Sequence, residues 1–271
     1  MSKPEFTRNK TDNDNPKIDV SGKEVVHFLH IGKTGGTAVK YALKNNLTIL
    51  LDGGNDRATS IVSLSDIPYV LKLHCHQIRL KDIPDGEKFI FFLRDPIARF
   101  VSSFYSRKRK GLPRYYYDWH PDEEQGFQKF KTANELAGSI TSEDSKISDA
   151  AVKAMKSIFH VNTSFWDWFN NKEYFLSRMQ DIFFIGFQEN LDDDFENLKI
   201  KLGLPDTIKL PAGDLEAHKG EHSDSEKFLD RKAIKNLKEW YAKDYEFFKL
   251  CRKTITSDQR EGREFQKQAE G

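Results

Sequence analysis

Long runs of apolar residues recur along the chain, and each is followed by a short polar turn. Such runs are typical of β-strands covered on both faces, because neither face then needs polar side chains. A shorter apolar run predicts one further strand at residues 48–51. The long runs lie at residues 24–31, 68–73, 88–93 and 181–187.

Helices are predicted between these strands. Residues 37–46 follow a glycine-rich turn, and Pro96 suits the first turn of a second helix because its missing N–H group is harmless there. Strands that alternate with helices imply an α/β protein, in which helices flank a central parallel sheet. The other segments with helical character lie at residues 126–180, 190–202 and 224–251, the last broken once.

The composition is that of a chain that builds a full core and a well-solvated surface. With 271 residues, 38% hydrophobic and 31% charged, it is expected to form one large or two small domains. We predict one folded domain over residues 23–251, a disordered N-terminal arm over residues 1–22 and a polar C-terminal tail over residues 252–271. The formal net charge of +1 gives no global field that would attract nucleic acid or a membrane.

Cysteine usage and the absence of long apolar segments suggest a location. Cys75 and Cys251 are far apart and match no metal-site spacing, so we expect free thiols, which indicate either a reducing compartment or indifference to redox conditions. No apolar run approaches the length of a membrane span, and residues 1–23 lack the apolar stretch of a signal peptide. The chain is therefore expected to be soluble, unsecreted and cytoplasmic.

The turn Gly-Lys-Thr-Gly-Gly-Thr at residues 32–37 links the first predicted strand to the first helix. Backbone N–H groups in such a turn, the dipole of the following helix and the charge of Lys33 all favour an anion. The turn is not a Walker A loop, which has four residues between its glycines and ends in Gly-Lys-Ser/Thr. The alternative interpretation is an ordinary strand–helix connection with a solvated lysine.

Arg94 and Ser102 form a second candidate anion site. Arg94 directly follows the strand at residues 88–93, and Ser102 lies about two helical turns further on. A guanidinium and a hydroxyl that converge on one point suit a phosphate monoester. The alternative is that Arg94 pairs with Asp95 and that Ser102 is merely exposed. We interpret Arg99 as a structural ion-pair partner.

His74 and His76 follow the strand at residues 68–73. Side chains alternate along an extended segment, so only one of the two faces a given pocket. A histidine beside an anion site can act as a general base, since its unperturbed pKa lies near neutral pH. A metal site is not predicted, because a His-x-His pair without a third nearby ligand is a weak signal. A purely structural role of both histidines stays open.

The three clusters share one property, which is that each directly follows a predicted strand. In a parallel sheet the carboxyl ends of the strands lie at one edge, and ligands bind there. The sequence therefore predicts that Lys33, His74, His76 and Arg94 line one crevice.

Two further features give weaker signals. Residues 107–110 are basic and precede the aromatic residues 115–119, so they could attract an acidic acceptor, but we favour a solvated helix end. The aromatic residues could stack on sugar rings or belong to the core. Lys219, in a predicted loop, could close over a ligand, but the signal is very weak.

Residues 30–37 and 92–105 together resemble the two phosphate-binding motifs of sulfotransferases that use 3′-phosphoadenosine 5′-phosphosulfate. The first is similar to the 5′-phosphosulfate loop of the carbohydrate branch that includes heparan sulfate 2-O-sulfotransferase. Gly32 stands where a proline is common in that branch, which predicts a looser turn with Lys33 still in register. The second is similar to the 3′-phosphate motif in residue types and in the Arg-to-Ser spacing.

His74-Cys75-His76 resembles the His-x-His of the 2-O enzymes, which implies that His76 is the base, with His74 as the alternative. Residues 185–189 and 240–245 are weaker likenesses, whereas residues 106–180 match nothing assignable. The resemblance implies a three-layer fold like that of P-loop NTPases, formed by a single domain.

The resemblance also implies a mechanism that needs no metal. Lys33 would stabilise charge on the bridging oxygen, and His76 would take the proton of an acceptor hydroxyl, which the branch suggests is carried by a carbohydrate. The residues implied to bind the donor nucleotide are Gly32, Lys33, Thr34, Gly35, Gly36, Thr37, Arg94 and Ser102.

Two other classes of function are kept as alternatives. A nucleotide-dependent phosphotransferase on a similar fold would need a Walker-type lysine and an acidic, magnesium-binding strand end, and the sequence contains neither signature. A non-catalytic nucleotide-binding module would keep the phosphate motifs but lack a base.

Overall fold

The structure is a computed structural model that describes residues 20–51, 59–113, 115–212 and 224–269. The predicted loop at residues 52–56, Lys219 and most of the expected N-terminal arm lie outside the described residues. Cys75 and Cys251 are buried and unbridged, as expected of free thiols. Among the described helices, none combines the length and the apolar character that crossing a membrane requires.

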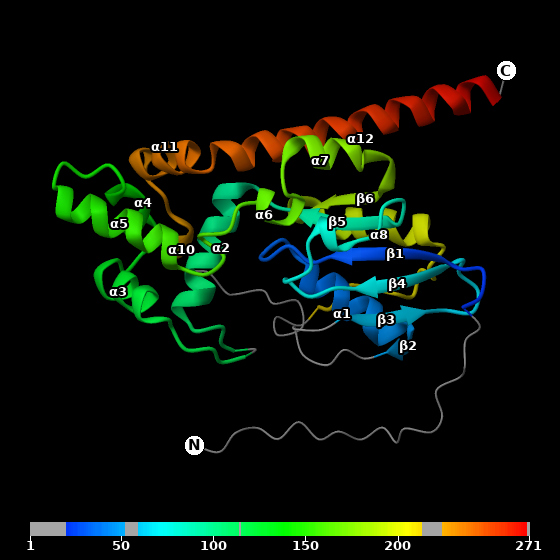
Figure 1. Cartoon of the computed structure of the whole chain (residues 1–271), viewed down its shortest axis with the longest axis horizontal. Helices are drawn as coiled ribbons and strands as arrows, with labels where there is room; N and C mark the ends of the chain where they lie inside the picture. Colours follow the sequence, from blue (N-terminus) through cyan, green and yellow to red (C-terminus); the bar gives the residue numbers. More distant parts are fainter. Residues whose placement is uncertain (1–19, 52–58, 114, 213–223, 270–271) are drawn as a thin grey trace, which may run out of the picture.

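A six-stranded sheet forms the centre of the molecule, with the strand order β2-β3-β4-β1-β5-β6 (Figure 1). Strands β4, β1, β5 and β6 run parallel to one another, whereas β2 and β3 are antiparallel to their neighbours. The bounds are β1 (Glu24–Leu29), β2 (Thr48–Leu51), β3 (Ser60–Ser63), β4 (Tyr69–Leu73), β5 (Lys88–Leu93) and β6 (Ile182–Phe187).

The predicted α/β class with a central sheet is confirmed, but the sheet is mostly rather than wholly parallel. The antiparallel part follows from chain length, because only residues 64–68 join β3 to β4. A parallel crossover needs a dozen or more residues, so this short link permits only an antiparallel pair. Strand β3 is not predicted from the apolar pattern, because it is four residues long and begins and ends with serine.

Helices cover both faces of the sheet and make three layers. Along β5 the side chains alternate, so that Ile90 and Phe92 join the core on one face while Phe89 and Phe91 join the core on the other. The first face is covered by α1 (Gly36–Asn46) and α8 (Leu191–Leu202). The second is covered by α6 (Trp166–Phe169), α7 (Lys172–Ser177) and α12 (Ala242–Ala269).

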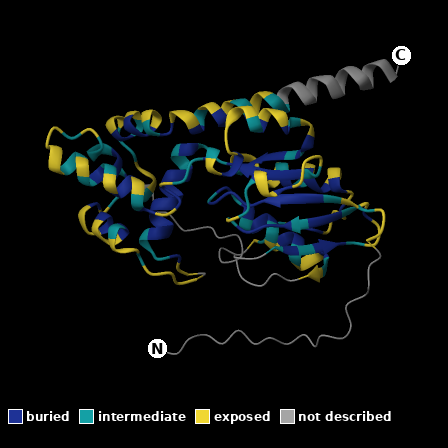
Figure 2. Ribbon diagram, viewed as in Figure 1, coloured by how far each residue is buried: buried dark blue, intermediate teal, exposed yellow. Residues whose placement is uncertain are grey.

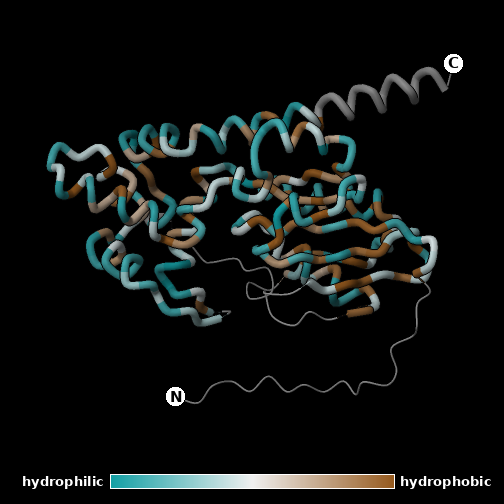
Figure 3. The backbone as a smooth tube through the Cα atoms, viewed as in Figure 1, coloured by the Kyte–Doolittle hydropathy of each residue, from teal (hydrophilic) through white to brown (hydrophobic). Residues whose placement is uncertain are grey.

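A second group of helices packs beside the sheet around a core of its own (Figure 1). Figure 2 shows that the strands are largely buried while these helices alternate between buried and exposed positions, and the hydropathy in Figure 3 follows the same pattern. The group comprises α2 (Pro96–Lys108), α3 (Pro121–Lys129), α4 (Ala133–Ser139), α5 (Ser145–Ser157) and α11 (Arg231–Trp240).

Short elements and the C-terminal helices complete the fold. The amphipathic segment expected at residues 224–251 is three helices rather than two, since α10 (Asp224–Lys227) and α11 precede α12. The C-terminal tail expected from residue 252 continues α12 as far as Ala269. Three short 3₁₀ turns are η1 (Leu80–Asp82), η2 (Met179–Asp181) and η3 (Gln188–Asn190).

Candidate functional site

Three neighbouring parallel strands bring the three polar clusters to one edge of the sheet. Strand β1 pairs with β4 on one side and with β5 on the other, in parallel register. The turn with Lys33 follows β1, His74 and His76 follow β4, and Arg94 follows β5. The predicted convergence at the carboxyl ends of the strands is therefore present in the fold.

The backbone of residues 32–37 has the shape of an anion-binding turn. Lys33 and Gly35 both adopt left-handed conformations, with φ angles of 69° and 85°. Thr34 is buried and its hydroxyl donates to the Ile31 carbonyl at 2.9 Å, which fixes the turn from inside. Helix α1 starts directly after Gly35, and no side chain caps its first N–H groups. Alternating conformations of this kind and an uncapped helix start both favour an anion.

Gly32 is packed against an imidazole ring. A Cβ atom at Gly32 would lie 2.5 Å from Nδ1 of His160, so any larger residue would have to displace this ring. Arg99 also holds the turn, because its Nε donates to the Gly32 carbonyl at 3.0 Å. These contacts hold the turn in place, whereas the sequence predicts a looser turn at Gly32. The absence of a side chain at Gly32 makes room for the ring of His160.

Arg99 is buried and has a different role from the predicted ion-pair partner. Its guanidinium donates to two backbone carbonyls, those of Gly32 at 3.0 Å and Thr163 at 2.7 Å. Burial is the main cause of the lowered pKa of Arg99, and the nearby Asp244 carboxyl partly offsets it. Arg99 thus ties the turn after β1 to the segment that carries His160.

His160, whose sequence context indicates no role beyond packing or the surface, lies between the candidate site residues Gly32 and His76. Its backbone is left-handed, with a φ of 67°, which is uncommon for a residue other than glycine. Its ring stands edge-on to His76 with centroids 5.3 Å apart. Burial, followed by the charges of His76 and Lys33, holds the pKa of His160 well below its usual value. The ring is therefore neutral at physiological pH.

Gly32 and His160 should behave as a matched pair. Gly32→Ala is expected to destabilise the protein by about 1–3 kcal/mol through overpacking. Adding His160→Gly should recover much of this loss, because it removes the ring and suits the left-handed backbone. Urea unfolding of both single variants and the double variant measures the coupling. Gly138→Ala, in α4 with nothing within 4 Å of the new Cβ, is the control. Strict additivity of the two changes would disprove the pairing.

His76 is held in an orientation that defines its tautomer. It is half-buried, its ring centroid lies 3.9 Å from that of His30, and its Nδ1 lies 3.0 Å from the His30 carbonyl oxygen. A carbonyl oxygen only accepts, so Nδ1 carries the hydrogen. In the neutral ring Nε2 is then the nitrogen with the lone pair, as a general base requires.

His74 faces a different environment, in which other side chains engage both ring nitrogens. Nε2 lies 2.7 Å from Nδ1 of His27, and Nδ1 lies 2.8 Å from the Thr59 hydroxyl. His27 in turn pairs with Glu87 through its other nitrogen. Burial, followed by the charge of His27, lowers the pKa of His74 to about 3. This geometry favours a structural role for His74.

The buried His74 should make stability fall in acid. Its folded pKa of about 3 lies below the usual 6.5, so between these values the unfolded chain binds more protons. Stability therefore decreases as pH falls through this window, by up to about 1.4 kcal/mol per pH unit. Replacing His74 by Asn should flatten this slope in unfolding curves recorded between pH 7 and pH 4. An unchanged slope would show that His74 does not carry the effect.

Arg94 directly follows β5 and has a buried side-chain atom without a partner. Within the described residues, its Nε has no hydrogen-bond partner. Burial lowers the pKa of Arg94, while the charges of Glu189 and Asp95 partly restore it. Ser102 is buried on α2, and no hydrogen bond connects it to Arg94 in the described part of the chain. An unsatisfied buried guanidinium nitrogen fits an anionic ligand at this corner.

Asp95 fixes the corner beside Arg94. Its Oδ1 accepts from the N–H groups of Ile97 and Ala98, both at 3.0 Å, and so caps α2. The Asp95 N–H donates to Glu189 at 2.6 Å, and Tyr245 donates to Asp95 Oδ2 at 2.9 Å. The weaker likenesses at residues 185–189 and 240–245 thus include residues that brace this corner.

Helices α11 and α12 also brace the segment after His160. The Tyr241 hydroxyl, at the junction of these helices, donates to the Val161 carbonyl at 2.9 Å. Asp244 accepts from the Phe165 N–H at 2.5 Å and from the Ser164 hydroxyl at 3.1 Å. Burial raises the pKa of Asp244. The sequence gives no local signal for these contacts, because each partner lies about 80 positions away.

The basic run at residues 107–110, which begins in the last turn of α2, is not wholly the solvated helix end that the sequence predicts. Arg107 is buried and forms an ion pair with Glu123 at 2.7 Å. Among the described residues, no group of three or more histidine, cysteine, aspartate or glutamate side chains has an arrangement that could hold a metal ion.

Residues 16–250 match the model of the sulfotransferase family. No curated protein matches the chain.

Proposed function

The chain belongs to the sulfotransferase family, and from this premise we propose that it moves a sulfuryl group from 3′-phosphoadenosine 5′-phosphosulfate to a hydroxyl group of a carbohydrate. Membership supports sulfuryl transfer in general, while the donor, the acceptor class and the residue roles are part of the proposal. We assign the catalytic domain to residues 23–251.

The observation that carries the proposal is the pairing of two anion sites on adjacent strands. The turn after β1 offers left-handed backbone, an uncapped helix start and Lys33. The corner after β5 offers the unsatisfied Nε of Arg94. A nucleotide with phosphates at both its 3′ and 5′ positions needs two such sites, and these residues fit that requirement.

Each residue then has a defined task. Lys33 and the N–H groups of residues 34–37 bind the 5′-phosphosulfate, and Lys33 stabilises the charge that develops on the bridging oxygen. Arg94 and Ser102 hold the 3′-phosphate and so fix the position of the nucleotide. When bound, the nucleotide supplies the sulfuryl group.

His76 is the general base of the proposal. Its Nδ1 hydrogen is committed to the His30 carbonyl, so Nε2 accepts the proton of the acceptor hydroxyl. His160 stays neutral beside it and places no second positive charge next to the base. The bonding of both His74 nitrogens supports the choice of His76 over His74.

Nucleotide binding tests the donor half of the proposal. Thermal melts of the purified protein with 3′,5′-adenosine bisphosphate should show stabilisation of about 3 kcal/mol at a hundredfold excess over Kd. Adenosine 5′-monophosphate, which lacks the 3′-phosphate, should stabilise the protein less. Equal protection by both nucleotides, or none by either, would contradict the two-site assignment.

Transfer of labelled sulfur from the donor to glycans, phenols and simple alcohols tests the acceptor half. The proposal expects label on glycans. Label on phenols alone would show that the acceptor is a phenol and not a carbohydrate. Nucleotide binding without transfer of sulfur to any acceptor would favour the non-catalytic module.

A further inference from the structure

Two aromatic side chains stand out into solvent beside the site. Tyr117 is 58% exposed and Phe159 is 50% exposed, although such rings are usually at least partly covered. Tyr117 precedes α3, and Phe159 follows α5 directly before His160. They are 42 positions apart in the chain and come from different segments of the helical group.

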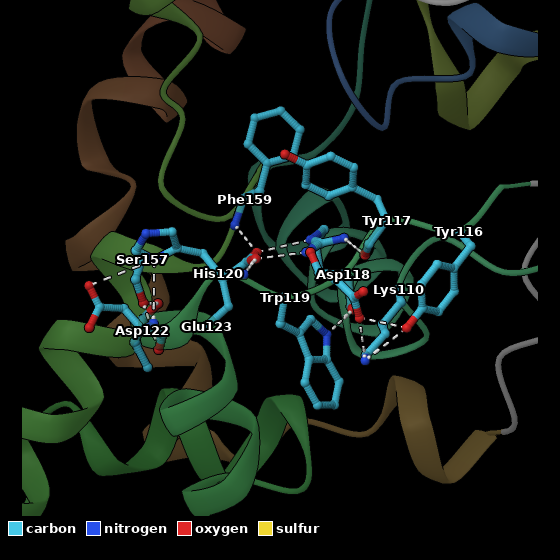
Figure 4. A network of polar contacts seen from close by, with 12 residues as sticks. Lys110, Tyr116, Tyr117, Asp118, Trp119, His120, Asp122, Glu123, Ser157 and Phe159 are labelled. Carbon is cyan, nitrogen blue, oxygen red and sulfur yellow. Dashed lines mark hydrogen bonds and ion pairs between the residues drawn. The ribbon is translucent and has the colours of Figure 1, made fainter.

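A buried ion pair holds the backbone at both rings (Figure 4). Arg107 and Glu123, each almost fully buried, are joined by two hydrogen bonds of 2.9 and 2.7 Å. Arg107 also donates to the Tyr117 carbonyl at 3.1 Å, and Glu123 accepts from the Phe159 N–H at 2.9 Å. One ion pair therefore fixes the main chain under both exposed rings.

Figure 4 shows the rings of Tyr117 and Phe159 projecting to the same side of this network. Hydrogen bonds from Arg107 and from two backbone N–H groups outweigh the effect of burial and lower the pKa of Glu123, so the pair stays charged at neutral pH. A rigid backbone below exposed rings reduces the entropy lost when a ligand binds. This arrangement is suited to binding.

Ring contacts connect Phe159 to the proposed base through the buried His160. The ring of Phe159 lies 4.1 Å from that of His160, and His160 lies 5.3 Å from His76, measured between ring centroids. A ligand lying on Phe159 is thus separated from His76 by a single imidazole ring.

The charges in this network are paired with one another. Besides Arg107 and Glu123, Lys110 pairs with Asp118 at 2.8 Å, and Lys153 pairs with Asp122 at 2.9 Å. Tyr116 joins the second pair by donating to Asp118 at 2.5 Å. The network therefore presents ring faces and neutralised ion pairs, which suit a neutral, flat-faced ligand better than an anionic one.

We propose that Tyr117 and Phe159 form an acceptor platform that binds an uncharged sugar ring of a glycan and presents its hydroxyl to His76. The inference rests on the proposed function and names its acceptor class. The C–H face of a pyranose ring matches an aromatic face, while its hydroxyl groups stay in water. The resemblance to the heparan sulfate branch would instead suggest an anionic acceptor.

Truncation of the platform should weaken acceptor binding only. Phe159→Ala and Tyr117→Ala are each expected to raise KM for a neutral glycan about threefold to tenfold, as loss of one aromatic contact predicts, with kcat and nucleotide protection unchanged. Both side chains are exposed, so both variants should fold. Ile200→Ala, which removes a 75% exposed side chain on α8, is the matched control.

Saturation-transfer difference NMR tests the platform without requiring turnover. The probes are cellotetraose, chitotetraose and maltotetraose as neutral glycans, and tetragalacturonate as the anionic one. We expect saturation of a neutral probe by the native protein and the Ile200→Ala variant, and a loss of signal in the two platform variants.

The outcomes separate this inference from the proposed function. Signals that are unchanged in Phe159→Ala and Tyr117→Ala, or absent for every neutral probe, overturn the platform even if nucleotide binds and sulfur is transferred. Preferential binding of tetragalacturonate overturns the uncharged class. Failure of 3′,5′-adenosine bisphosphate to protect the protein overturns the proposed function, whereas the NMR result still decides whether the platform binds sugar.

Discussion

Replacing His76 by alanine is expected to lower kcat by about 10²- to 10⁴-fold, the usual contribution of a general base. The Nδ1 hydrogen bond to the His30 carbonyl, at 3.0 Å, presents Nε2 as the accepting nitrogen, and alanine cannot replace it. Single-turnover kinetics with saturating donor and acceptor measures the loss. Protection by 3′,5′-adenosine bisphosphate should be unchanged, because His76 lies after β4 and the nucleotide motifs lie after β1 and β5.

His74→Asn is the contrasting variant. It should lower the free energy of unfolding, since it disturbs the bonds to His27 and Thr59, but it should leave most of kcat in the protein that remains folded. Near-native turnover by His76→Ala would move the base elsewhere. A large loss of kcat in a fully folded His74→Asn variant would instead identify His74 as the general base.

Replacing Lys33 by alanine should lower kcat by roughly 10²- to 10³-fold, as removal of one charge-stabilising group does in comparable sites. Lys33 adopts a left-handed backbone conformation in the turn directly before α1. Alanine keeps the Cβ atom and the backbone strain, and removes the rest of the side chain with its positive charge. Pre-steady-state transfer of labelled sulfur measures the change in the chemical step.

Arg94→Ala should separate nucleotide binding from the chemical step at the second anion site, which follows β5. Loss of a charge-assisted contact is expected to weaken binding of 3′,5′-adenosine bisphosphate by roughly tenfold to a hundredfold. Binding of adenosine 5′-monophosphate should hardly change. If Lys33→Ala and Arg94→Ala gave the same pattern of kcat and Kd, the two sites would not have the separate tasks assigned to them.

Much of the fold and the location of the site could be predicted because they depend on local patterns. Strands β1, β4 and β5 are mostly apolar, so their ends are marked by the polar residues that follow. Once strands alternate with helices, these ends must meet at one edge. The same rule could not foresee β3, or the antiparallel direction of β2 and β3, which depends on how short the links are.

The contacts that shape the site could not be predicted from the sequence. His160 reaches Gly32 across more than a hundred positions, and Arg107 finds Glu123 only after the chain has turned from α2 into α3. In each case the partner is set by tertiary packing, which overrides the local tendency of a charged or polar side chain to be solvated. Tertiary packing also decides the role of Arg99, because this residue donates to two backbone carbonyl groups, whereas the sequence indicates an ion pair.

The contacts of Tyr241, Asp244 and Tyr245 have a consequence for the order in which the protein is made. Every motif of the proposed nucleotide site has been synthesised once residue 102 is added, yet Tyr245 reaches Asp95 across 150 positions of sequence. The segment after His160 likewise forms its hydrogen bonds to Tyr241 and Asp244 only after these residues have been synthesised. Synthesis runs from the N-terminus, so the catalytic corner is braced only when the final helices dock. A chain that stops before residue 241 would carry the complete signature and remain an inactive product.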